Sequence, residues 1–192
     1  MLTLTLASSS PYRRDLLARL GLEFNCLIPD INEQAKTGES PPELVRRLAE
    51  EKALAVADKA TGGLVIASDQ VASLEQQILT KPGGFDAAFR QLAACAGKCV
   101  TFYTSLALLN VQTRHLQCSV ETTEVRFRAL SAEQVSRYLK AEEPYDCAGS
   151  FKVEGLGISL FSAIRGDDPN ALIGLPLIRL VEFLANEGVE IP

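Results

Sequence analysis

A short apolar run in the first half of the chain most constrains how the chain can fold. Leu64-Val65-Ile66-Ala67 follows a pair of glycines and leads into Ser68-Asp69-Gln70. A continuous apolar run of this length predicts a strand that is buried on both faces, as in sheets with helices on both sides. An acid at the end of such a strand is a common place for chemistry in α/β proteins, because the strand fixes it at the edge of a crevice. An aspartate that only begins a turn is the alternative.

Helical and extended patterns alternate along the rest of the chain. We predict strands over residues 2–6, 24–28, 64–67, 100–110, 116–127 and 158–161, with 100–110 and 116–127 forming a hairpin. We predict helices over about 11–20, 41–60, 85–96 and 132–141, and a terminal helix that follows Gly174-Leu175-Pro176 and runs to about 186. These elements predict a single α/β domain over residues 1–192, with a long mixed β-sheet, flanking helices and two lobes around a cleft.

Composition excludes several classes of protein. The chain has 192 residues and a formal net charge of −5, which argues against a general nucleic-acid or membrane-surface binder. It shows neither a signal peptide nor an apolar stretch long enough to span a bilayer, so we expect a cytoplasmic protein. Its five cysteines lack the spacing of a zinc site, and we expect them to be reduced and mostly buried.

The single histidine restricts the chemistry further. His115 lies in a predicted polar turn and beside no plausible nucleophile, so mechanisms of the Ser–His–Asp or Cys–His type are disfavoured. We expect an exposed turn histidine. Any chemistry should then depend on carboxylates, lysines, arginines and a metal.

The stretch from Ser8 to Arg13 predicts a strand, a serine-rich turn and a helix start. Ser10 suits the N-cap and Pro11 suits the first helical position. Amides, hydroxyls and two arginines, Arg13 and Arg14, would meet at one helix N-terminus, which attracts anions and phosphate above all. An ordinary capped helix with solvated arginines is the alternative.

Further candidates are spread along the chain. Each has a simpler interpretation. Glu33 could be a solvated acid in a loop, and Lys52 could be a helix residue whose side chain extends to water. Taken together, the cations and acids are those that hydrolysis of a nucleotide phosphoanhydride requires. The full candidate set is Ser8, Arg13, Glu33, Lys52, Asp69, Lys81 and Lys152.

Several short motifs occur in a fixed order along the chain: Ser8-Ser9-Ser10-Pro11 with Arg13 and Leu16-Leu17, Glu33, Glu51-Lys52-Ala53, Ser68-Asp69-Gln70, Lys81-Pro82, Ala148-Gly149-Ser150-Phe151 and Gly174-Leu175-Pro176. Through these motifs the chain resembles, nearly from end to end, the Maf family of nucleoside triphosphate pyrophosphatases. The resemblance implies a two-lobed Maf/ITPase-like fold with the active site in the cleft. It also implies hydrolysis between the α and β phosphates, with a divalent cation such as Mg²⁺, Mn²⁺ or Co²⁺.

One subgroup of this family, which acts on 7-methyl-GTP, is the most similar. Its specificity set corresponds here to Tyr12, Gln70 and Glu154. Tyr12 could stack on the positively charged base, and Glu154 could accept hydrogen bonds from its N1–H and exocyclic amine. Gln70 could form a hydrogen bond with an atom at the edge of the base, or it could position Asp69. A partly buried aromatic and a solvated loop acid are the alternatives for Tyr12 and Glu154.

The resemblance assigns the remaining roles. Asp69 would be the general base or a metal-bound carboxylate, and Glu33 the second metal ligand. The phosphate groups would be held by Ser8, Arg13, Lys52 and Lys81, with Lys152 a weaker candidate. The expected partner is a small-molecule nucleotide, with a possible homodimer. Two alternative functions remain, a broader house-cleaning pyrophosphatase for UTP, dTTP or modified nucleotides, and a nucleotide-sensing regulator of cell division.

Overall fold

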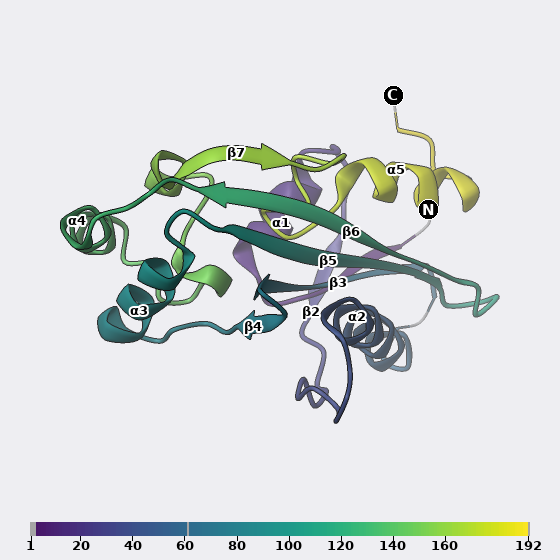
Figure 1. The fold of residues 1–192 in the computed structure, drawn as a ribbon. Coiled ribbons are helices and arrows are strands. Elements are labelled where there is room, and N and C mark those ends of the chain that lie inside the picture. Colours follow the sequence, from purple (N-terminus) through teal and green to yellow (C-terminus); the bar gives the residue numbers. More distant parts are fainter. Residues whose placement is uncertain (1–2, 61, 192) are drawn as a thin grey trace. The chain divides into compact units, whose positions relative to one another are not determined.

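The computed structural model describes residues 3–60 and 62–191 (Figure 1). Within this part of the chain the strands form a seven-stranded mixed sheet in the order β2-β1-β3-β5-β6-β7, with β4 paired to β3. The strands are β1 (Leu4–Ala7), β2 (Asn25–Leu27), β3 (Leu64–Leu74), β4 (Gln77–Leu79), β5 (Cys99–Asn110), β6 (Leu116–Phe127) and β7 (Phe161–Arg165). β1 pairs in parallel with β2 and β3, whereas β4 and β7 are antiparallel to their partners. The predicted mixed α/β sheet is confirmed.

The helices are α1 (Pro11–Ala18), α2 (Pro41–Ala57), α3 (Phe85–Cys95), α4 (Ala132–Glu142) and α5 (Leu177–Asn186), with short 3₁₀ turns at Ala148–Ser150 and Leu156–Leu160. Their starts follow the predicted local signals. Ser10 caps α1, and the boxes Ser40–Glu43 and Ser131–Gln134 cap α2 and α4.

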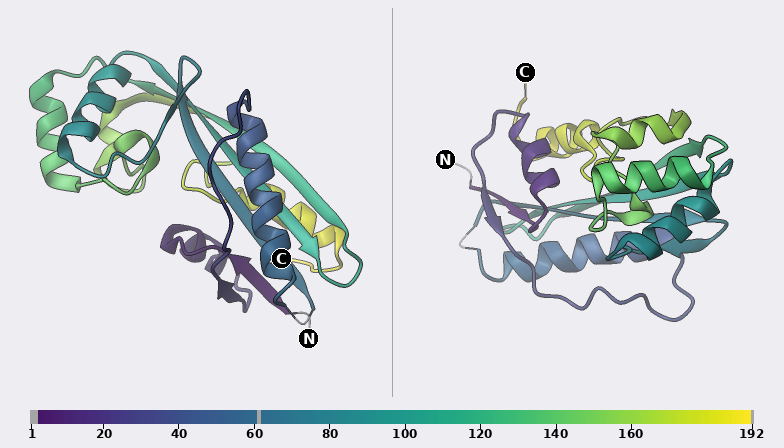
Figure 2. Two further views of the ribbon diagram at one scale, coloured as in Figure 1. Left: turned by 90° about the horizontal axis from the view of Figure 1, so that it is seen from below. Right: turned by 90° about the vertical axis from the view of Figure 1, so that its left-hand side faces the viewer.

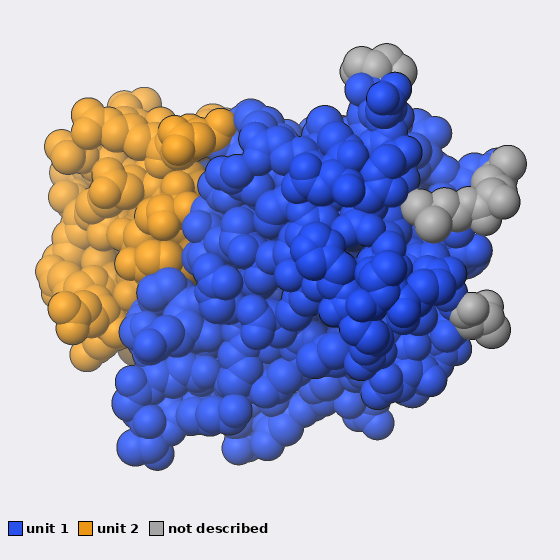
Figure 3. Space-filling view, turned by 90° about the vertical axis from the view of Figure 1, so that its right-hand side faces the viewer, with its two compact units in different colours: residues 1–69, 104–121, 168–192 blue, residues 70–103, 122–167 orange. Residues whose placement is uncertain are grey.

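The chain forms two compact units (Figure 3). Unit 1 comprises residues 1–69, 104–121 and 168–192, and unit 2 comprises residues 70–103 and 122–167. The single domain predicted over residues 1–192 stays a prediction.

The core of unit 1 has two layers because its strands are covered on both faces. One face packs against α1 and α5 through alternate residues such as Leu64, Ile66 and Leu106. The opposite face packs against α2, largely through alanines such as Ala49, Ala53 and Ala67. Figure 2 shows α2 on one side of the strands and α1 with α5 on the other. The prediction that residues 64–67 are buried on both faces is confirmed.

Unit 2 has an aromatic core. Phe151 makes edge-to-face contacts with Phe102, Phe127 and Phe161, with ring centroids 4.7–5.8 Å apart. Gly149, at φ +77°, lets the backbone pass this cluster, because a Cβ there would lie 3.2 Å from the Phe102 ring.

Two predicted strand positions are wrong. Asp69 does not end its strand, because β3 continues for five more residues and pairs with β4. Residues 158–160 of the predicted strand 158–161 are not extended. A 3₁₀ turn occupies Leu156–Leu160, where Gly157 approaches the Lys152 carbonyl too closely for a side chain, and β7 begins at Phe161.

Candidate active site

Lys52 is the centre of a buried charge cluster in unit 1. It lies on α2 and is 5% exposed, so it does not extend to water. Its Nζ lies 2.6 Å from Asp69 Oδ1 and 2.8 Å from Glu33 Oε1. A buried ammonium needs such partners because losing its hydration is costly. The structure therefore brings together three of the predicted site residues, one each from α2, β3 and the loop before α2.

Asp69 is held in place by its backbone as well as by Lys52. The side chain is buried, and the Asp69 N–H donates to Ser105 Oγ at 3.0 Å. The Ser105 hydroxyl in turn donates to the Val45 carbonyl of α2 at 2.7 Å. Ser105 thus links β5, β3 and α2 at the point where the carboxylate emerges.

Arg13 joins the cluster from the start of α1. Its backbone N–H donates to the N-cap Ser10 Oγ, and Ser8 Oγ accepts from the Ser10 N–H at 3.1 Å. Burial lowers the pKa of the Arg13 guanidinium, while the charges of Asp69 and Glu33 oppose that shift. The guanidinium is therefore within electrostatic reach of both carboxylates.

The carbonyl of Gly174 orients Arg13 and was not predicted. It accepts from Arg13 Nε at 2.9 Å and from Ser68 Oγ at 2.8 Å. Gly174 has φ +129°, a conformation that favours glycine. The Gly174-Leu175-Pro176 motif marked this position in the sequence, although it did not reveal that a backbone oxygen makes the contact with Arg13.

Asp168 shapes the segment that carries Gly174. It is 4% exposed, and its carboxylate accepts from the Asn170 N–H at 2.8 Å and from the Ile178 N–H at 2.7 Å. The second bond caps α5, whose N-cap position is occupied by Pro176. In the sequence, Asp167-Asp168-Pro169-Asn170 predicts only a turn.

The other predicted residues have separate places. Tyr12 is half-buried on α1 in unit 1, beside Arg13 in sequence. Unit 2 contains Gln70 at its first position, Lys81 in an exposed loop, and Lys152 and Glu154 in the segment after α4. This last segment is attached to α4, because the Lys152 N–H donates to the Tyr138 hydroxyl and the Leu156 N–H donates to Glu142. The roles predicted for all the site residues stay predictions, those of Tyr12, Gln70, Lys81 and Glu154 included.

The two carboxylates beside Lys52, those of Glu33 and Asp69, are the candidate metal ligands of this cluster. No group of three or more His, Cys, Asp and Glu side chains with metal-binding geometry occurs in residues 3–60 and 62–191. Glu33 and Asp69 nevertheless both reach one point, the Lys52 ammonium. Two convergent carboxylates can serve a cation whose other ligands come from substrate and water.

His115 and the cysteines lie outside this cluster. His115 is exposed in its turn, as predicted, and its Nδ1 lies 2.8 Å from Glu187 Oε1. All five cysteines are free, but the expectation that most are buried is wrong: Cys95 is the one buried cysteine of the five, whereas Cys26 and Cys99 are exposed and Cys118 and Cys147 are partly buried. Burial raises the pKa of the Cys95 thiol to about 12.

Comparison with known proteins defines the family. The model of the family described as Maf-like protein matches residues 3–187, and the chain belongs to this family. The predicted family is thus confirmed. In the described part of the chain no helix is long and apolar enough to cross a membrane.

Several relatives match over nearly their whole length. Proteins named 7-methyl-GTP pyrophosphatase share 56% identity in Pseudomonas fluorescens, covering 100% of both chains, and 55% in Alcanivorax borkumensis, covering 99% of this chain and 96% of that one. The protein of the same name in Pseudomonas aeruginosa is 54% identical over 98% of both. The solved structure of the Staphylococcus aureus Ham1 protein has the same fold, with a TM-score of 0.52 and 13% identity over 96% of this chain and 99% of that one.

Proposed function

We propose that this chain is an enzyme that hydrolyses 7-methyl-GTP to 7-methyl-GMP and pyrophosphate, by attack of water between the α and β phosphates. Relatives with this name, 53–56% identical over most or all of their length, support the substrate and the reaction. The observation that carries the proposal is the Lys52 ammonium buried between the carboxylates of Glu33 and Asp69, with Arg13 in electrostatic reach. Cations and convergent acids are what phosphoanhydride hydrolysis needs.

A divalent cation fits the carboxylate pair. Mg²⁺ is usually bound through one or two carboxylates together with substrate phosphates and water, and Glu33 with Asp69 match this requirement. These two residues would hold Mg²⁺, Mn²⁺ or Co²⁺. When bound, the ion would polarise phosphate oxygens and lower the pKa of a water molecule.

The protein's own groups then have distinct tasks. Arg13 and Lys52, with Ser8 and Lys81, hold the phosphate oxygens and balance the negative charge that grows in the transition state. Asp69, whose backbone is fixed by Ser105, accepts the proton of the attacking water. Burial favours this arrangement, because electrostatic interactions are stronger where water is excluded.

Three further residues would read the base. Tyr12 offers an aromatic face to a cationic ring, and Glu154 offers acceptors to the N1–H and exocyclic amine of 7-methylguanine. Gln70 follows Asp69 directly and would bond a base edge. We further propose that the enzyme is cytoplasmic and forms a homodimer.

Pyrophosphate release with Mg²⁺ or Mn²⁺ tests the proposal across 7-methyl-GTP, GTP, UTP, dTTP and CTP. We expect a preference for 7-methyl-GTP that is lost in Glu154→Ala. Asp69→Asn should lower kcat roughly 10²- to 10⁴-fold, the usual contribution of a general base. Asp15→Asn is the matched control, because the Asp15 side chain is 70% exposed.

Two results would contradict the proposal in different ways. Faster turnover of UTP or dTTP would indicate a broader house-cleaning pyrophosphatase and remove the roles of Tyr12, Gln70 and Glu154. Tight nucleotide binding without turnover would indicate a sensor of nucleotides.

A further inference from the structure

The loop that carries Glu33 has little apolar packing to hold it. Residues 28–40 connect β2 to α2 without a helix or strand, and residues 32–38 are all exposed. The Glu33 side chain itself is 60% exposed. The ion pair with Lys52 engages only the end of the Glu33 side chain and does not by itself fix the backbone of an exposed loop. Other contacts must therefore fix where the Glu33 carboxylate lies.

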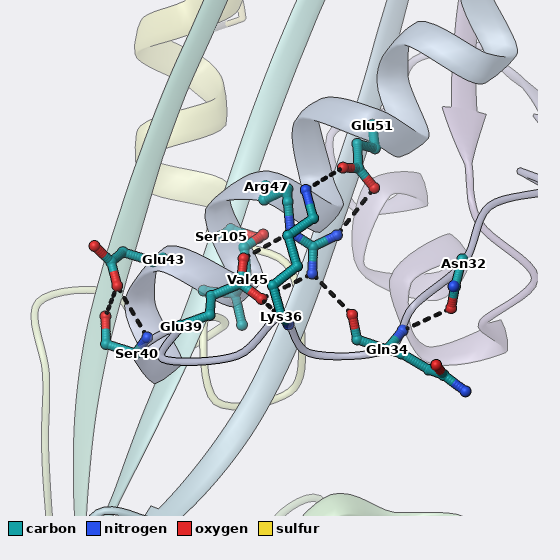
Figure 4. Close-up of polar contacts among 10 residues, drawn as sticks. All are labelled: Asn32, Gln34, Lys36, Glu39, Ser40, Glu43, Val45, Arg47, Glu51 and Ser105. Carbon is teal, nitrogen blue, oxygen red and sulfur yellow. Dashed lines mark hydrogen bonds and ion pairs between the residues drawn. The ribbon is translucent and has the colours of Figure 1, made fainter.

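Arg47 of α2 makes such contacts at the end of the loop. Its Nε lies 2.6 Å from Glu39 Oε1, and its Nη2 lies 2.8 Å from Glu39 Oε2 (Figure 4). Two parallel bonds between a guanidinium and a carboxylate give both strength and a defined orientation. The Arg47 side chain is only 15% exposed, so this pair is shielded from solvent more than an ordinary surface pair.

The same guanidinium also reaches the residue next to Glu33. Arg47 Nη2 donates to the Gln34 carbonyl at 3.0 Å, and Nη1 donates to Glu51 Oε2 at 3.0 Å. The Gln34 N–H donates to Asn32 Oδ1 at 3.0 Å (Figure 4). This bond closes a local turn whose middle residue in the sequence is Glu33. Arg47 thus fixes the backbone on the C-terminal side of Glu33. Lys52, five residues further along α2, pairs with the Glu33 carboxylate.

The charges of this network support a permanent clamp. The hydrogen bonds from Arg47 are the main reason that the pKa of Glu39 is lowered to about 2. The hydrogen bonds and charges of Glu39 and Glu51 raise the pKa of Arg47. Both partners therefore stay charged across the pH range in which enzymes work.

We propose that Arg47 is a positioning residue that holds the loop of residues 28–40 so that the Glu33 carboxylate meets Asp69 at the Lys52 ammonium. The inference rests on the proposed function, since it takes Glu33 to be a metal-binding carboxylate. Arg47 acts through Gln34 and Glu39 and touches neither substrate nor metal.

The test compares Arg47→Lys with Arg46→Lys. Lysine keeps the positive charge but lacks the planar guanidinium that bonds both oxygens of a carboxylate. Arg46 is the matched control, because it also faces a glutamate four residues on, at 3.9 Å from Glu50, but its side chain is 50% exposed. Glu39→Gln weakens the same clamp from the loop side, because an amide has no charge and only one acceptor oxygen. Two measurements are made on each full-length variant: amide hydrogen exchange of residues 30–39, and the Mg²⁺ concentration that gives half-maximal pyrophosphate release.

We expect Arg47→Lys and Glu39→Gln to speed exchange in residues 30–39 while exchange in β3 and β5 stays unchanged. The half-saturating Mg²⁺ concentration should rise roughly 10- to 100-fold, as when the support of a metal ligand is lost. Arg46→Lys should change it by less than about threefold. In a Glu33→Gln background, Arg47→Lys should cause no further loss.

Unchanged exchange in Arg47→Lys would overturn the inference, as would a loss of activity that is equally large in the Glu33→Gln background. Failure of the proposed function is a separate result, namely no pyrophosphate release by the wild-type protein from any nucleotide. In that case the exchange data alone decide whether Arg47 positions the loop.

Discussion

Ser105 and Ser119 are serines with buried hydroxyls on the neighbouring strands β5 and β6, and they make a matched pair for mutation. Ser105 Oγ bonds the Asp69 N–H and the Val45 carbonyl, whereas Ser119 Oγ has no hydrogen-bond partner among the described residues. We predict that Ser105→Ala lowers the free energy of unfolding by about 1–3 kcal/mol, because a buried N–H loses its acceptor. Ser119→Ala should be neutral or stabilising, since it removes an unsatisfied polar group.

Urea unfolding of both variants measures this difference, and pyrophosphate release should fall only in Ser105→Ala. Equal effects of the two substitutions on stability would show that Ser105 does not hold Asp69.

Among individual residues, charged site residues are easier to identify from the sequence than the groups that orient them. Lys52, Asp69 and Glu33 could be proposed because each is a rare type in a recognisable context. Ser105 could not, because a serine in a long strand has many interpretations. The Gly174 carbonyl could not either, because every residue has a carbonyl and its donor Arg13 is 161 positions away.

Among the elements, Glu187 ties the end of α5 to the β5–β6 hairpin. It accepts from Asn110 Nδ2 at 2.7 Å, lies 2.8 Å from His115 Nδ1, and accepts from Gln117 at 3.2 Å. These contacts, with Asn110 the largest, lower the pKa of Glu187 from its ordinary value of 4.5. A carboxyl whose pKa is lower in the folded state stabilises the fold above its unfolded pKa, and this contribution is lost as pH falls through the folded pKa.

We therefore predict that Glu187→Gln is less stable than wild type at pH 7 and that the difference shrinks as pH falls below about 4.5. Denaturant midpoints at pH 7 and pH 3 measure it. Glu182→Gln is the control on the same helix, because Glu182 is 54% exposed and pairs only with its near neighbour Arg179 among the contacts of the described chain. A difference that is independent of pH would contradict the prediction.

Helix starts were predicted well because they depend on residues three positions apart. The capping boxes at Ser40 and Ser131 are such local signals. The course of β3 through Asp69 was not predictable in this way, because polar residues inside a strand resemble a turn until their partners are known. Here the partners are Ser105 and Gly174, both more than 30 residues away in sequence.

For the molecule as a whole, metal dependence should be separate from folding. Lys52 already pairs with both Glu33 and Asp69, so the protein itself balances the charges of the proposed metal ligands. We predict that a chelator abolishes pyrophosphate release but leaves the thermal unfolding midpoint unchanged, and that Mg²⁺ or Mn²⁺ restores activity. A midpoint that falls on chelation would mean that the metal contributes to folding.

The α/β class and the family could be predicted from the sequence, since both depend on patterns along the whole chain. The strand order β2-β1-β3-β5-β6-β7 and the division into two units could not, because they depend on which distant segments pair.

The composition of unit 1 from three separate segments has a consequence for biosynthesis. Arg13 leaves the ribosome long before Gly174, which supplies its acceptor 161 residues later. At about 5–20 residues per second, that interval lasts roughly 8–30 s. During this time α1 lacks the carbonyl that orients Arg13, so Arg13 can reach its final position in the charge cluster only after Gly174 has been synthesised.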